Sequence, residues 1–163
     1  MGENMNRVRA YDVEENKMIY MEDAYPNTKY KFEYNAADNY RLSLMKLKRK
    51  VKVYDEDEKE YIHTEFSKIP STIMEYIGVD DKFGQPIYEA DKVILKVSVY
   101  MQIGKKKKLI DIERYTGKII KMWMSGWAIE CDNEDNNKVS YYMLSNILNK
   151  DYTLEVIGNA LEN

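Results

Sequence analysis

The chain has very little of the residues on which several classes of protein depend. Its 163 residues include one cysteine, one histidine, three prolines and seven glycines. One cysteine cannot form an intramolecular disulfide, and one histidine leaves a histidine-based zinc site or a Ser-His-Asp triad resting on a single residue. So few prolines and glycines argue against a long flexible linker. We therefore expect no disulfide framework and no histidine-rich catalytic centre.

Long apolar runs are missing as well. No stretch approaches the ~20 apolar residues that a membrane-spanning helix requires. The opening residues, Met1 to Asn6, hold neither the basic region nor the apolar run of a secretory signal. These absences predict a cytoplasmic protein with no membrane association.

The composition that remains is that of a folded, strand-rich protein. Hydrophobic residues make up 44% and charged residues 33% of the chain, which is enough apolar material to form a core. There are 15 tyrosines against three phenylalanines. Because tyrosine favours strands and half-buried surfaces, the excess predicts β structure.

The pattern of apolar residues supports short antiparallel strands. Residues 92–100 are rich in β-branched side chains and form the strongest predicted strand, buried on at least one face. Residues 118–124 and 127–131 predict a hairpin closed by a two-residue turn at Ser125-Gly126. Residues 109–115 predict a separate strand that ends at Thr116-Gly117. Residues 143–148 predict one or two helical turns before a closing strand at 152–157.

The first part of the chain is less regular. Residues 36–50 fit either a helix capped at Asp38-Asn39 or a strand. From Lys46 to Lys52 the alternation places the lysines on one side of a strand. The acidic run 55–58 predicts a solvated turn, after which 61–66 return as the partner strand.

These elements predict an α+β protein that is mostly β. We expect residues 1–70 to form a strand-rich N-terminal region that contains a β-hairpin. Residues 71–163 are expected to form a small C-terminal β-barrel of SH3-like type with one short helix. The boundary is placed near Pro70, where the chain changes to shorter turns and closer strands.

Several short motifs, spread over both ends and the middle of the chain, resemble those of the YopX family of bacteriophage and prophage proteins. They are Arg9-Ala10-Tyr11-Asp12, Lys17-Met18, Tyr76-Ile77-Gly78, Asp81-Lys82-Phe83-Gly84, Ile87-Tyr88-Glu89-Ala90-Asp91, Val156-Ile157-Gly158-Asn159 and Glu162-Asn163. Residues 28–70 carry none of them. Ile77 stands where the family pattern has threonine, and Ala90 stands where it has glycine. Either the turn at Ala90 does not need a positive φ, or the backbone differs locally.

The resemblance implies a phage-encoded, cytoplasmic, β-rich accessory protein that self-associates, and it carries no biochemical activity with it. We expect the matching motif positions to be structural. They are Tyr76, Gly78, Asp81, Gly84, Tyr88, Asp91, Gly158 and Asn159.

The acids of the central motif offer a site for a hard cation or an acid–base pair. Asp80, Asp81, Glu89 and Asp91 could converge across the turn at Gly84. Aspartates in turns are more often recruited to bind backbone N–H groups. We therefore expect no metal, no cofactor and no catalytic residue here.

Two basic clusters raise the alternative of nucleic-acid binding. The candidate contacts are Lys46, Lys48, Lys50, Lys105, Lys106, Lys107, Lys108, Trp123 and Trp127. Small β-barrels bind single strands through a charged groove and aromatic platforms. The net charge of −3 and the neighbouring acidic runs favour plain solvation of these lysines. The leading expectation is therefore a non-enzymatic homo-oligomer that works through protein contacts with a host or phage protein.

Overall fold

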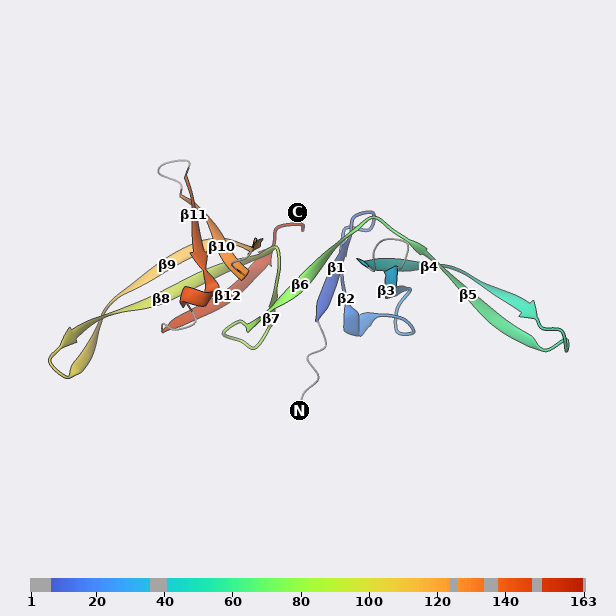
Figure 1. Ribbon diagram of the computed structural model, residues 1–163, viewed down its shortest axis with the longest axis horizontal. Coiled ribbons are helices and arrows are strands. Elements are labelled where there is room, and N and C mark those ends of the chain that lie inside the picture. Colours follow the sequence, from blue (N-terminus) through green and yellow to red (C-terminus); the bar gives the residue numbers. More distant parts are fainter. Residues whose placement is uncertain (1–6, 36–40, 124–125, 134–137, 148–150, 163) are drawn as a thin grey trace. The chain divides into compact units, whose positions relative to one another are not determined.

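The computed structural model describes residues 7–35, 41–123, 126–133, 138–147 and 151–162. Regular structure in these ranges is almost entirely antiparallel strand (Figure 1). The predicted class, α+β and mostly β, is confirmed. The strands are β1 (Val8–Asp12), β2 (Lys17–Tyr20), β3 (Tyr30–Asn35), β4 (Arg41–Tyr54), β5 (Glu60–Lys68), β6 (Ser71–Asp80), β7 (Pro86–Tyr88), β8 (Asp91–Ile103), β9 (Lys106–Met122), β10 (Gly126–Asn133), β11 (Lys138–Met143) and β12 (Tyr152–Asn159), with a 3-10 turn η1 (Met21–Asp23) and a helix α1 (Leu144–Ile147).

The chain divides into two compact units, Met1–Met74 and Glu75–Asn163. The division falls inside β6, which begins shortly after Pro70, the residue at which the sequence predicts a boundary. Strand β6 therefore contributes residues to both units.

The first unit is built on two sets of strands. Strands β1 and β2 form a hairpin, and β3, β4 and β5 form a three-stranded sheet. Apolar side chains from both sets make one core, with Phe32 and Ile73 packed at its margin. The buried members of this core are Ala10, Ile19, Tyr30, Leu44 and Ile69. A strand fills the described part of 36–50, which resolves that ambiguity from Arg41 onward, whereas Asp38 and Asn39 lie outside the described residues.

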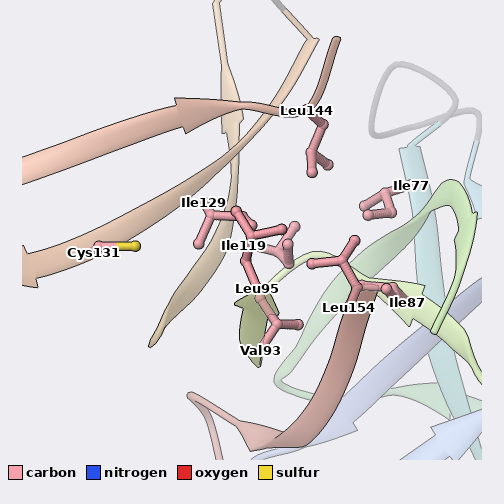
Figure 2. Close-up of a cluster of buried hydrophobic side chains, with 9 residues drawn as sticks. All are labelled: Ile77, Ile87, Val93, Leu95, Ile119, Ile129, Cys131, Leu144 and Leu154. Carbon is pink, nitrogen blue, oxygen red and sulfur yellow. The ribbon is translucent and has the colours of Figure 1, made fainter. Parts of the chain in front are cut away.

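The second unit is dominated by a five-stranded antiparallel sheet in the order β11-β10-β9-β8-β12, which curls around its core (Figure 1). Figure 2 shows the core side chains, which come from β6, β7, the sheet and α1. They are Ile77, Ile87, Val93, Leu95, Ile119, Ile129, Cys131, Leu144 and Leu154. Strands β11 and β12 are the two edges in this strand order, and the SH3-like description of the unit stays a prediction.

The structure corrects one predicted strand boundary. Strand β9 runs without a break from Lys106 to Met122, through the Thr116-Gly117 pair at which the sequence predicts an end. Gly117 does not form a turn but allows the backbones of β9 and β10 to approach closely. A Cβ built on it would lie 2.4 Å from the carbonyl oxygen of Glu130. The predicted hairpin with β10 is present, with Gly126 paired to Met122, while Ser125 of its turn lies outside the described residues.

Candidate interaction surfaces

The carboxylate of Asp81 closes the loop between β6 and β7. Its Oδ1 accepts the N–H groups of Phe83 and Gln85 at 2.8 and 3.0 Å, and its Oδ2 accepts the N–H of Val156 at 3.3 Å. Burial opposes the charged form, but these donors outweigh it and lower the pKa of Asp81 below its usual value. Gly84 completes the loop with a φ of +81°, as the sequence predicts.

Asp91 makes a second buried link between distant parts of the chain. Its Oδ2 accepts the N–H of Tyr88 at 2.8 Å, and its Oδ1 accepts the side-chain amide of Asn159 at 3.2 Å. Asp91 and Asn159 are both buried. Asp80, by contrast, is exposed and accepts the hydroxyl of Tyr76 at 2.9 Å. Within the described residues, no group of three or more histidine, cysteine or acidic side chains is placed to hold a metal ion.

A polar network in the first unit, centred on the buried residues Asp12 and Tyr30, joins β1, β3 and β4. The hydroxyl of Tyr30 lies 2.8 Å from Oδ2 of Asp12 and 2.7 Å from Oε2 of Glu15. Lys46 approaches Glu15 Oε1 at 2.7 Å, and Lys29 approaches the same oxygen at 2.5 Å. Hydrogen bonds from Lys29, Lys46 and Tyr30 lower the pKa of Glu15 to about 2. Burial, followed by its hydrogen bonds to the two carboxylates, raises the pKa of Tyr30.

This network removes Lys46 from any open basic surface. A β-bulge then separates it from the other lysines of the first cluster, since Leu47 pairs with Phe66 but Arg49 pairs with Glu65. Lys48 is the extra residue, so the alternation of faces reverses there and Lys50 lies on the face opposite Lys46. The prediction that these lysines line one side of a strand is wrong.

The second basic cluster occupies the end of a two-stranded ribbon, here called the basic arm (residues 99–112). Strand β12 pairs with β8 only as far as Val97, and β10 pairs with β9 only over residues 118–122. Beyond those points β8 and β9 pair with each other alone, and Figure 1 shows them extending from the sheet. Lys105, Lys106, Lys107 and Lys108 are all exposed at its tip.

The basic arm also exposes large apolar side chains. Their exposed fractions range from 41% for Tyr100 to 53% for Ile112. The six are Tyr100, Met101, Ile103, Leu109, Ile110 and Ile112. Tyr100 is paired with Leu109, and Ile103 is paired with Lys106 on the opposite face of the ribbon. Both faces of the arm therefore present apolar groups to solvent.

A second ribbon of the same kind, here called the acidic arm (residues 49–65), ends strands β4 and β5. Strand β3 pairs with β4 only over residues 41–46, so the arm consists of β4 and β5 alone. Its turn carries Asp55, Glu56, Asp57 and Glu58, all exposed. Tyr54, Tyr61 and Ile62 are each more than half exposed beside this turn. The carboxylate of Asp55 accepts the N–H groups of Asp57 and Lys59 and so shapes the turn.

The two tryptophans proposed as stacking platforms have different surroundings. The side chain of Trp123 is 92% exposed. Trp127 packs against the core of the second unit, and the ammonium of Lys121 lies 5.4 Å from its ring centroid. Trp127 therefore contributes to the core, and of the two only Trp123 presents most of its ring to solvent.

A family model described as YopX protein matches residues 7–163. The chain belongs to the YopX family. A solved structure, that of protein EF1440 from Enterococcus faecalis, is similar at 20% sequence identity and a TM-score of 0.44, with 98% of this chain and 95% of that chain covered. No match is found among curated proteins.

The motif positions of this YopX chain lie mainly in turns and pairings. Tyr76 pairs with Tyr88 across β6 and β7, and their rings meet edge to face with centroids 6.0 Å apart. Gly78 has a φ of +86°, and Gly158 has a φ of +154° at a register shift of β12. Each of these two glycines thus occupies a backbone conformation that other residues rarely adopt.

Ala90 is the informative departure from the YopX pattern. Its φ is +65°, in the left-handed region that the family's usual glycine adopts without strain. The turn therefore keeps its positive φ although the glycine is gone. Hydrogen bonds hold it in place, since the N–H of Ala90 donates to Ile119 and its carbonyl accepts from Ala160.

No helix of the described residues is long and apolar enough to cross a membrane. Sequence reasoning predicted the solvated turn at 55–58 and the solvation of the lysines, but it missed the Tyr30 network and the extension of both arms as two-stranded ribbons. The motif 9–12 already contains Asp12, but nothing near it in the sequence marks Tyr30 as its partner.

Proposed function

We propose that this member of the YopX family is a phage- or prophage-encoded accessory protein of the bacterial cytoplasm that acts without catalysis, through protein contacts, as a homo-oligomer. The observation that carries the proposal is the basic arm, a ribbon of two strands with apolar side chains exposed on both faces. An isolated two-stranded hairpin is marginal in water, and apolar surface of this kind is typical of an interaction site.

Two acids of the central motif, Asp81 and Asp91, support a non-catalytic role. Asp81 and Asp91 accept hydrogen bonds from three and two N–H groups respectively, which are the bonds that hold their loops. A general base or a metal ligand needs a lone pair directed at a reacting group or an ion. These carboxylates direct theirs at the protein's own backbone and at Asn159.

Co-expression of two differently tagged copies tests the homo-oligomer directly. The chain is purified through one tag in the presence of nuclease, and the second tag is then measured in the eluate. We expect the second tag to be retained in proportion to its expression. Its absence from the eluate, with both copies soluble, would overturn the homo-oligomer.

The alternative is a nucleic-acid-binding module of SH3-like type. It is favoured by Lys105 to Lys108, which form no ion pair with any carboxylate among the residues that the structure describes. Fluorescence anisotropy with a labelled single-stranded DNA of about 20 nucleotides tests this alternative. It predicts a Kd that rises steeply with salt concentration. It also predicts that binding is lost when Lys105 to Lys108 are replaced by glutamine. Replacing the exposed Lys92 and Lys96 in the same way is the matched control.

A further inference from the structure

We propose that the basic arm of one copy binds the acidic arm of a second copy of the same chain. The inference rests on the homo-oligomer proposed above and specifies the two surfaces that meet. Each arm is an exposed ribbon of two strands, and each combines a charged tip with large exposed apolar side chains. The binding partner of the basic arm is therefore the acidic arm of a neighbouring protomer, and the binding partner of the acidic arm is a neighbouring basic arm.

The tips of the two arms carry opposite charges. The tip of the basic arm carries four consecutive lysines, and the turn of the acidic arm carries four consecutive carboxylates. Within the described residues the four lysines have no acidic partner, and of the four acids Asp57 forms a loose ion pair with Lys59 at 3.8 Å. Opposite charges of this density guide association and fix orientation when two surfaces meet.

Both arms also place apolar side chains next to charged ones. On the basic arm Ile103 is paired with Lys106 and Met101 with Lys108. On the acidic arm Tyr54 is paired with Glu60, and its exposed fraction is 63%. Cross-strand partners lie side by side on one face. Each arm thus places an apolar group beside a charge, so that contact between the arms can bury the apolar groups and pair the charges together.

Reciprocal charge reversal tests this contact. One variant carries Lys106→Glu, Lys107→Glu and Lys108→Glu, and the other carries Glu56→Lys, Asp57→Lys and Glu58→Lys. Asp55 is left unchanged because its carboxylate closes the turn. Each variant alone has two arms of like charge, so we expect self-association measured by sedimentation velocity to weaken at least tenfold. An equimolar mixture restores opposite charges, and we expect it to form mixed oligomers.

A chain that carries both sets of reversals is the sharpest control. Its net charge remains −3 because the changes cancel, yet its arms have exchanged their signs. We expect it to self-associate like the wild type. Single-set variants that keep the wild-type oligomer would overturn the arm-to-arm contact while leaving the homo-oligomer intact. A wild-type chain that is monomeric would instead overturn the homo-oligomer itself.

The apolar part of the contact has its own variant. Leu109→Ser and Ile112→Ser together remove two exposed apolar groups from the basic arm without touching its lysines. We expect at least a tenfold weaker association, with unchanged unfolding of the monomer. Ile157→Ser removes a side chain of similar exposure, 48%, from β12 outside the arm and should leave association unchanged. Equal effects of the arm and control variants would contradict the proposal.

Discussion

The side-chain amide of Asn159 donates to the carboxylate of Asp91 at 3.2 Å, and both side chains are buried. This bond joins the central motif of the chain to its closing motif, 68 residues away. Asp81 makes a similar link, because its carboxylate accepts the N–H of Val156. The motifs at 81–91 and 156–159 therefore make hydrogen bonds that hold β12 to the loops around β7.

Asp91→Ala should destabilise the second unit by about 2–3 kcal/mol, because the N–H of Tyr88 and the amide of Asn159 lose their acceptor in a buried site. Both tryptophans of the chain, Trp123 and Trp127, belong to this unit. Urea unfolding followed by tryptophan fluorescence therefore reports on it. Asp91→Asn keeps one acceptor oxygen and should lose less. Equal stability of the alanine variant and the wild type would show that the link is dispensable.

Ala90→Gly should stabilise the second unit by about 1 kcal/mol, because glycine adopts a φ of +65° without the steric cost that alanine incurs. The same urea experiment measures the gain. Ala128→Gly is the control, since Ala128 is buried in β10 and outside the positive-φ region. That change should destabilise the unit. A loss of stability at both positions would mean that the turn at Ala90 carries no strain.

Gly117→Ala should destabilise the second unit by about 1–3 kcal/mol, the usual range for overpacking. The new methyl group would meet the carbonyl oxygen of Glu130 at 2.4 Å and the side chain of Cys131 at 2.8 Å. Thr116→Ala, at the exposed neighbouring residue, should change stability by less than about 0.5 kcal/mol. Similar midpoints for the two variants would show that β9 and β10 separate easily at this point.

The stability of the first unit should fall in acid because of Glu15. Its folded pKa of about 2 lies below the ordinary value of 4.5, so its stabilising contribution is present above pH 4.5 and is lost as the pH falls toward 2. We expect the calorimetric Tm of Glu15→Gln to fall less steeply over this range than that of the wild type.

Glu22→Gln, at an exposed residue of the same unit, is the matched control for Glu15 and should follow the wild type. Parallel curves for wild type and Glu15→Gln would refute the role assigned to the Tyr30 network.

Local patterns predicted the elements that depend on local chemistry. The β-branched run at 92–100 became β8, with Val93 and Leu95 fully buried, and the expected helical turn became α1. The hairpin of β9 and β10 followed from its two apolar runs. In each case the residues that decide the element lie within a few positions of one another.

The features that sequence reasoning missed depend on residues far apart in the chain. The bulge at Lys48 is set by how β4 pairs with β5, and alternation along β4 alone contains no sign of it. The local sequence around Gly117 is typical of a turn, and its close contact with Glu130 depends on how β9 pairs with β10. Asp12 and Tyr30 are 18 residues apart and meet only because β1 and β3 share a core.

Self-association through the two arms is tested most simply by the mass of the wild-type chain in solution. Sedimentation equilibrium at several protein concentrations, in about 50 mM and about 500 mM NaCl, spans weak and strong screening of the charged arms. Association through the charged arms predicts a multiple of the 19.4 kDa chain mass at low salt and a shift toward 19.4 kDa at high salt. A species of 19.4 kDa at every concentration and both salts would contradict it.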